Sequence, residues 1–205
     1  MDIFGDKHTW YCTLTYFMTF GTFAGMAAAF PMMIKSLYVP LESDLDPLKF
    51  AFYGPLIGSA TRVFFGKIAD KTGGAILTHI TGIALIILFS VLIFGGFLTP
   101  TTIDQFPYFV GIVMLIFFFT GIGNAATFKQ FPMIFSDSPR KAAGVIGWTA
   151  AIAAFGPFVF NVLISTSKSI SGDARLFFGL MLFICVFATF INWKFYTKKG
   201  CERPS

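Results

Sequence analysis

Long apolar runs alternate with short polar or turn-forming segments along the whole chain. A bilayer core about 30 Å thick requires roughly 20 apolar residues in a helix. Six runs reach that length, at residues 10–34, 50–69, 75–97, 106–131, 142–166 and 174–196. The segments between them are rich in acidic and basic residues, Gly and Pro, which favour turns. The pattern predicts an all-α membrane protein with one domain, residues 1–205, of six transmembrane helices.

Lys and Arg residues are unevenly distributed between the two sides of this predicted bundle. Six spans place both termini on one side, and ten of the 15 basic residues fall there. The opposite side has four, which are Lys35, Lys49, Lys168 and Arg175. Because cytoplasmic loops have the excess of positive charge, we expect both termini to be cytoplasmic and the chain to lie in the inner or plasma membrane.

Composition agrees with a membrane protein and disfavours other classes. Hydrophobic residues make up 56% of the chain and charged residues only 12%, whereas soluble domains have about 25% charged residues. The net charge is +5, but the basic residues stand at the ends of apolar runs, which argues against nucleic-acid binding. The three Cys residues follow no metal-ligand or disulfide spacing. We therefore expect no enzyme, metal site or cofactor.

Arg62 is the most informative polar residue, because a guanidinium inside a span is costly unless it meets water, a partner or a substrate. Helical spacing places Ser59, Gly58 and Gly66 near it, and such a face of small residues could line a cavity. A planar, permanently charged fork of donors suits a small planar oxyanion. The alternative is that Arg62 extends to the headgroups of the membrane lipid.

Acidic residues are confined to loops, helix ends and tails. Proton-coupled transporters usually place a carboxylate or His inside the membrane. His79, near the cytoplasmic end of the third predicted span, is the candidate for that role, and an interfacial position is the alternative. Exchange without protons is the simpler expectation.

The turn from Gly66 to Gly74 resembles the loop signature of the major facilitator superfamily. Its matching positions are Gly66, Asp70, Lys71 and Gly74. The resemblance implies a cytoplasmic motif that helps to hold one conformational state, with the Asp capping a neighbouring helix end. An ordinary basic turn is the alternative.

A closer resemblance covers nearly the whole chain. The stretch from Gly54 to Arg62 is similar to the eighth helix of the nitrate/nitrite porters, the NarK-type branch of that superfamily. Further similarity lies in His8-Thr9-Trp10, Tyr16 to Gly21, Gly121 to Phe128 and Gly144 to Phe158. The resemblance implies the carboxyl-terminal half of such a porter, helices 7 to 12.

The resemblance also implies roles for individual residues. Substrate binding is expected of Arg62, Tyr16, Gly147 and Ala150. Gating or lining of the pore is expected of Phe20, Ser59, Gly58, Asn124, Thr127, Gly144 and Gly156. Aromatic packing is the alternative for Tyr16 and Phe20, and helix packing for Asn124 and Thr127.

Two positions depart from the family pattern. Ala150 and Ala153 stand where the second glycine-rich nitrate signature has a serine and a glycine. Ala150 lacks the serine hydroxyl, which could contact the substrate, and Ala153 adds a methyl group where a glycine would let two helices pack more closely. The identity of the substrate is therefore less well defined than the resemblance to the family. Lys129 is expected at the cytoplasmic mouth.

The function implied is exchange of nitrate and nitrite by alternating access, with nitrate entering and nitrite leaving, as in nitrate assimilation. A transporter of this kind holds its solute between two six-helix halves, so we expect an amino-terminal half with a second arginine, in the same chain or a partner. The 205 residues would then be a fragment or half of an assembly. Alternatives are a proton-coupled or other monovalent-anion transporter and a non-transporting assembly or regulatory subunit.

Overall fold

The computed structural model describes residues 3–205, and every regular element in that range is a helix. The α-helices are α1 (Lys7–Tyr16), α2 (Thr22–Leu37), α3 (Tyr53–Thr72), α4 (Gly74–Phe94), α5 (Phe106–Ile134), α6 (Pro139–Ala154), α7 (Gly156–Ser171) and α8 (Arg175–Asn192). Two π-helical turns, η1 (Phe17–Gly21) and η4 (Trp193–Thr197), and two 3-10 turns, η2 (Pro47–Phe50) and η3 (Ile103–Gln105), complete the set.

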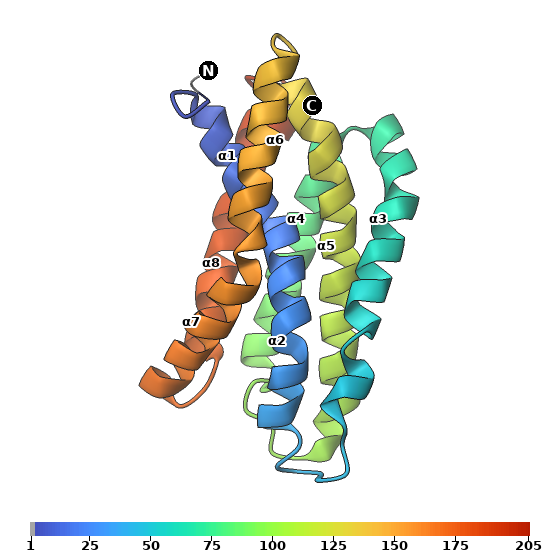
Figure 1. The fold of residues 1–205 in the computed structure, drawn as a ribbon, viewed down its shortest axis with the longest axis vertical. Coiled ribbons are helices and arrows are strands. Elements are labelled where there is room, and N and C mark those ends of the chain that lie inside the picture. Colours follow the sequence, from blue (N-terminus) through green and yellow to red (C-terminus); the bar gives the residue numbers. More distant parts are fainter. Residues whose placement is uncertain (1–2) are drawn as a thin grey trace.

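These helices form six rods (Figure 1). Helices α1 and α2 continue into each other through η1, α6 and α7 meet at Phe155, and η4 extends α8. Each predicted span corresponds to one rod, with ends that differ by up to five residues. Capping explains two of the differences: the Asp6 carboxylate accepts from the His8 amide at 2.9 Å, and Ser138 caps α6, which starts at Pro139. Helices therefore begin at polar caps that an apolar count leaves out.

Five of the rods are long and apolar enough to cross a membrane. They are Lys7–Leu37, Gly74–Phe94, Ile103–Ile134, Pro139–Ser171 and Arg175–Thr197. Helix α3 is not among them, because Arg62, Lys67 and Asp70 lower its mean hydropathy. The sixth span therefore remains a prediction, based on the length of α3 and its position in the bundle.

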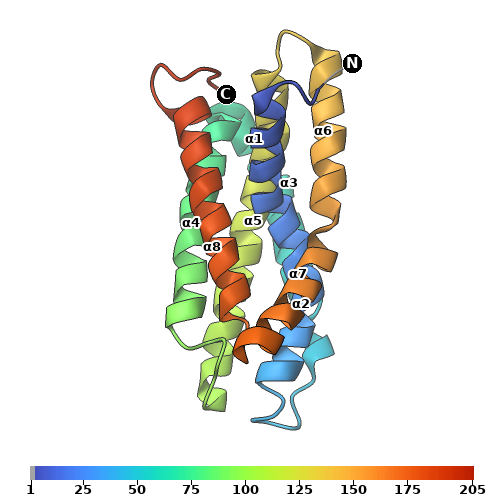
Figure 2. The ribbon, with the colours of Figure 1, turned by 90° about the vertical axis from the view of Figure 1, so that its left-hand side faces the viewer.

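Helix α5 is packed between α3 and α4, and α8 lies against α4. The α1–α2 rod lies against the α6–α7 rod along its length, with α1 next to α6 and α2 next to α7. Both termini lie at the same end of the bundle (Figures 1 and 2). We call this end the terminus end. Its assignment to the cytoplasm remains a prediction from charge.

At two of the close contacts between rods, a glycine of one rod meets a glycine of the other. A Cβ on Gly121 of α5 would lie 2.4 Å from the Gly58 carbonyl oxygen of α3. A Cβ on Gly156 of α7 would lie 2.4 Å from the Gly21 carbonyl oxygen of η1. No side chain larger than hydrogen fits at such an approach. These contacts determine the position of α3 along α5 and the position of the α6–α7 rod along the α1–α2 rod.

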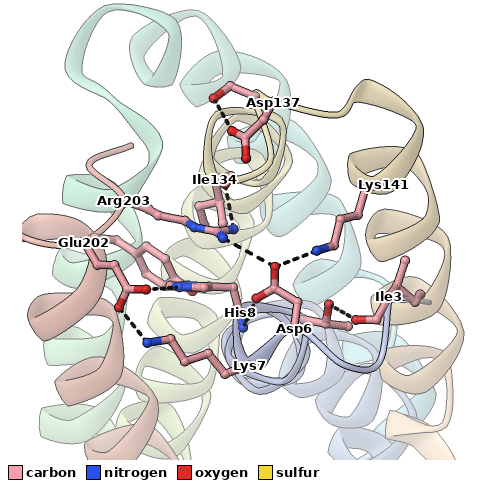
Figure 3. A network of polar contacts seen from close by, with 12 residues as sticks. Ile3, Asp6, Lys7, His8, Ile134, Asp137, Lys141, Glu202 and Arg203 are labelled. Atoms are coloured by element: carbon pink, nitrogen blue, oxygen red, sulfur yellow. Dashed lines mark hydrogen bonds and ion pairs between the residues drawn. The ribbon is translucent and has the colours of Figure 1, made fainter. Parts of the chain in front are cut away.

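A polar network ties the rods together at the terminus end (Figure 3). The Asp6 carboxylate accepts from Lys141 of α6 at 2.7 Å and from Arg203 of the carboxyl-terminal tail at 3.4 Å. Arg203 also donates to the Ile134 carbonyl at the end of α5. Glu202 accepts from Lys7 at 2.8 Å and lies 3.1 Å from the His8 ring. The tail therefore connects the ends of α1, α5 and α6.

Replacement of Asp6 by asparagine is expected to weaken this network by about 1–2 kcal/mol, which is below the full value for hydrogen bonds to a charged group because Lys141 and Arg203 are partly exposed to solvent. Burial acts to raise the pKa of the Asp6 carboxyl, but hydrogen bonds from Lys141 and the His8 amide and the charge of Arg203 together lower that pKa. A lowered pKa gives stability that is present above about pH 4 and lost as the pH falls further. Thermal unfolding in detergent between pH 7 and pH 3 measures this.

The difference in melting temperature between the parent and the Asp6→Asn protein should shrink toward the acid end of that range. Asp44→Asn is the matched control, because Asp44 is exposed in the loop at the other end. An Asp6→Asn protein that melts like the parent at pH 7 would contradict the assigned role of this carboxylate.

Candidate anion site

Arg62 lies on α3 beside an aromatic cluster formed by α1, η1 and α5. Its guanidinium carbon is 5.0 Å from the centroid of the Phe128 ring. The edge of Phe128 meets Tyr16 at a ring separation of 5.6 Å, and Tyr16 stacks on Phe20 at 5.5 Å. We call Arg62, Phe128, Tyr16, Phe20 and Asn124 the Arg62 cluster.

Tyr16 is fixed from two sides. Its hydroxyl donates to the Asn124 side-chain oxygen of α5 at 3.3 Å, and both residues are buried. Phe20 packs on its ring from the π-helical turn that follows α1. Such turns occur preferentially at functional sites. The structure therefore brings Arg62, Tyr16, Phe20 and Asn124, which the sequence proposes separately, into one place.

The position of Arg62 follows from the contact between Gly58 and Gly121. Helices α3 and α5 run in the same direction (Figure 1). Arg62 lies four residues after Gly58, and Phe128 seven residues after Gly121, which is about 6 Å and 10 Å along parallel axes. The Arg62 side chain can bridge that difference. The glycine contact thus sets the guanidinium over the ring.

The charge of Arg62 has no carboxylate partner in the part of the chain that the structure describes. Within residues 3–205, no carboxylate lies within ion-pair distance of its guanidinium, and Arg62 is exposed on the surface of this half. The guanidinium lies over the face of Phe128, which favours a cation but does not neutralise it. An anion can therefore approach the guanidinium from the open side.

The other residues proposed for the site lie elsewhere or serve packing. Ser59 is exposed on α3, and on α6 Gly147 is exposed with open space around it, while Gly144 and Ala150 are half-buried. Gly58 and Gly156 are buried at the contacts between rods. A direct contact of these two glycines with a solute is therefore not supported by this conformation.

Thr127 is buried, and its hydroxyl donates to the Gly123 and Asn124 carbonyl oxygens of its own helix. Such internal bonds are common for Thr in apolar helices. The packing alternative therefore describes Thr127 better than a pore-lining role.

The turn between α3 and α4 adopts a defined structure. Gly73 ends α3 with a φ of +86°, a conformation that glycine tolerates. Asp70 pairs with Lys129 of α5 at 2.6 Å, which links the ends of α3 and α5. Gly74 is buried against α5, Gly66 has open space around it, and Lys71 is exposed. In this conformation Asp70 binds a neighbouring rod through Lys129.

Sequence reasoning did not single out two features. Phe128, which lies between Arg62 and Tyr16, appeared only as part of a motif. A buried chain of hydrogen bonds joins Thr78, Gln130 and Asn192, from α4, α5 and α8. The signal for this chain was available, since Gln130 and Asn192 are polar residues in otherwise apolar helices. It holds these three rods together.

Comparison with known proteins gives relatives of one kind. No family model matches the chain. A Thermus thermophilus protein named "Probable nitrate/nitrite antiporter NarK2" is 51% identical over 204 residues, which is 99% of this chain and 45% of that protein. The nitrate/nitrite transporter NarU of Escherichia coli strain K12 is 30% identical over 90% of this chain and 43% of its own length. A probable nitrate transporter, NarT, of Staphylococcus epidermidis is 26% identical over 89% of this chain.

The chain spans about half the length of the curated relatives that it matches. Together with five helices that are apolar and long enough to span a bilayer, these similarities show a multi-pass membrane protein. The relatives are transporters rather than enzymes. The chain is therefore a homologue of the NarK-type nitrate/nitrite porters and corresponds to about half of one, which confirms the resemblance read from its sequence.

Proposed function

We propose that the chain acts as one six-helix half of a nitrate/nitrite transporter and binds its anion at Arg62. The observation that supports this most directly is a guanidinium with no carboxylate partner in the described chain, held over Phe128 beside Tyr16. Nitrate and nitrite are small planar oxyanions, which accept two parallel hydrogen bonds from an Arg fork. The second half would cover the exposed side of Arg62 and complete the site.

Each member of the Arg62 cluster has a distinct part in this proposal. Arg62 supplies the positive charge and two hydrogen-bond donors. The Phe128 ring packs against the face of the guanidinium and orients it. Tyr16 would bind the anion through its hydroxyl, which in this conformation donates its one proton to Asn124 and would have to leave that partner. Phe20 covers Tyr16 and closes the site on one side. No covalent chemistry and no enzymatic activity is proposed.

Alternating access would follow from charge compensation. An anion between the Arg62 cluster and the other half neutralises positive charge that otherwise keeps the two surfaces apart. The loaded transporter can then rock between states. We propose exchange, nitrate inward and nitrite outward, because no carboxylate lies in the cluster to accept a proton. His79 does not provide a proton acceptor in the Arg62 cluster, since it lies on α4 and faces Thr189 and Trp193 of the α8 rod.

Flux measurements with the complete transporter in proteoliposomes test this. Vesicles loaded with nitrite should take up nitrate, and the rate should stay within about twofold when a pH gradient of one unit is imposed at fixed internal pH. Coupling to one proton would instead change the driving force by about 1.4 kcal/mol per pH unit, which is a tenfold change in the accumulation ratio of nitrate. Uptake that needs the pH gradient and not internal nitrite would support the proton-coupled alternative. The absence of any anion flux would support a non-transporting subunit.

A further inference from the structure

A cavity lies at the end of the bundle opposite the termini, between α2 and α7, and its apolar wall is formed by Ala29, Met32, Met33 and Ile164. It has a volume of about 150 Å³. Its polar lining comes from Ser36 of α2 and from Asn161, Ser165 and Lys168 of α7. No carboxylate lines it. The sequence analysis used Lys168 only to assign the orientation of the chain.

The charge of Lys168 is only partly satisfied by the protein. Its ammonium donates to the Ser36 hydroxyl at 2.7 Å. An ammonium has three donors, and in residues 3–205 no carboxylate lies within ion-pair distance of this one. The nearest acidic residue in sequence, Asp173, is paired with Arg175 at 2.6 Å. A half-buried cation at the edge of the cavity is therefore left without a carboxylate partner among residues 3–205.

The other polar groups face the same cavity for a reason of helix geometry. Asn161, Ser165 and Lys168 are spaced by four and three residues, which places them on one face of α7. That face lies against α2, from which Ser36 completes the lining. The Ser36 hydroxyl donates to the Met33 carbonyl oxygen at 3.3 Å. The Asn161 amide, the Ser165 hydroxyl and the Lys168 ammonium are therefore the groups that can donate to a solute. A cluster of donors without an acidic acceptor is suited to an oxyanion.

A purely structural role explains part of this arrangement. Lys168 lies in the last turn of α7, where a cation interacts favourably with the helix dipole. That role explains the charge of Lys168. It does not explain why Asn161 and Ser165 surround a cavity next to it. The two roles differ in one respect, because only a binding site responds to an added anion.

The cavity is distinct from the Arg62 cluster. Phe20 and Ser36 are separated by 16 residues of the α1–α2 rod, which corresponds to about 24 Å along its axis. The α1–α2 rod contributes to both places, to the Arg62 cluster through Tyr16 and Phe20 and to the cavity through Ser36. The backbone contact of Gly21 with Gly156 lies between them. An anion at Lys168 would therefore be near the mouth of the bundle and far from Arg62.

We propose that Lys168, Ser36, Asn161 and Ser165 form a weak site for a small oxyanion at the end opposite the termini. There it would hold the solute before the solute reaches Arg62. The proposal rests on the proposed function only for this role and for the choice of nitrate as probe. A lipid phosphate has the same oxygen chemistry, and the test separates the two sources.

Reductive methylation of lysines, with mass spectrometry of the protein in maltoside micelles free of phosphate, measures occupancy directly. Nitrate replaces gluconate at constant ionic strength. We expect nitrate to slow methylation of Lys168 at least threefold, with saturation, and to leave Lys35 unchanged. Lys35 is an internal control, because it is exposed at the same end and lines a different cavity, with Asp46.

Two variants strengthen the test. Asn161→Leu should lose the protection of Lys168 while the Lys35 rate stays at the parent value, which shows that the fold is intact. Arg62→Lys should keep the protection, so that failure of the Arg62 site and failure of this site are separate results. Methylation rates of Lys168 and Lys35 that change together, or not at all, would overturn the proposal.

Nanodiscs identify the source of the oxyanion. If Lys168 is protected in nanodiscs of anionic phospholipid without nitrate, and nitrate has no effect in micelles, then the occupant is a lipid phosphate and the role in solute transfer is overturned. Protection by nitrate in micelles that persists in nanodiscs supports the small-anion site.

Discussion

Nitrate exchange by the complete transporter is expected to fall about 10- to 100-fold when Arg62 is replaced by lysine. Hydrogen bonds to charged groups are worth about 1.5–3 kcal/mol, and a lysine ammonium retains the charge but loses the planar fork that binds both oxygens of an oxyanion. It also loses the flat contact with Phe128. Counterflow of labelled nitrate into vesicles loaded with nitrite measures the change.

The matched control for this result is Arg140→Lys. It is the same substitution at an exposed position in the first turn of α6, so it should leave counterflow within about twofold of the parent, as expected for a surface change. An Arg62→Lys protein that transports as well as Arg140→Lys would show that Arg62 does not bind the anion as a fork. The headgroup alternative, in which Arg62 contacts lipid phosphate, would then account for its position.

The sequence predicts the number of rods, their order and the shared end of the two termini, because apolar runs of bilayer length leave few arrangements. It locates Arg62 for the same reason, since a charge stands out in an apolar helix. The rod ends were predicted less well. Asp6 and Ser138 start helices through side-chain caps, and these lie outside the apolar runs.

The contacts between rods were not predictable from residue spacing alone. Gly58 was expected to line a cavity, because it lies one turn from Arg62, but the side from which a Cβ would project is occupied by the Phe23 ring and the Phe117 carbonyl oxygen. A glycine can either line a cavity or allow two helices to pack closely. Which of these roles it has depends on the neighbouring helix. Phe128 was overlooked for a related reason. The sequence contains 29 Phe residues, and nothing in it separates Phe128 from the others. Only the structure shows that its ring lies against the guanidinium.

A second large effect is expected from Gly121→Ala. Alanine in a helix is normally favoured over glycine by about 1 kcal/mol. At position 121 its Cβ would instead lie 2.4 Å from the Gly58 carbonyl oxygen and 3.0 Å from the Gly58 Cα. Backbone atoms cannot rotate away as a side chain can, so α3 must move. Overpacking of this kind costs about 1–3 kcal/mol or more, which corresponds to a decrease in melting temperature of roughly 3–10 °C.

Gly111→Ala provides the comparison, because Gly111 lies on the same helix with nothing within 4 Å of the added Cβ. That variant should melt at or slightly above the parent temperature, since only the helix preference acts. Equal melting of both variants would mean that α3 and α5 do not approach closely in the protein. Since that approach also sets Arg62 over Phe128, the Gly121→Ala protein should lose nitrate counterflow even below its melting temperature, whereas Gly111→Ala should keep it.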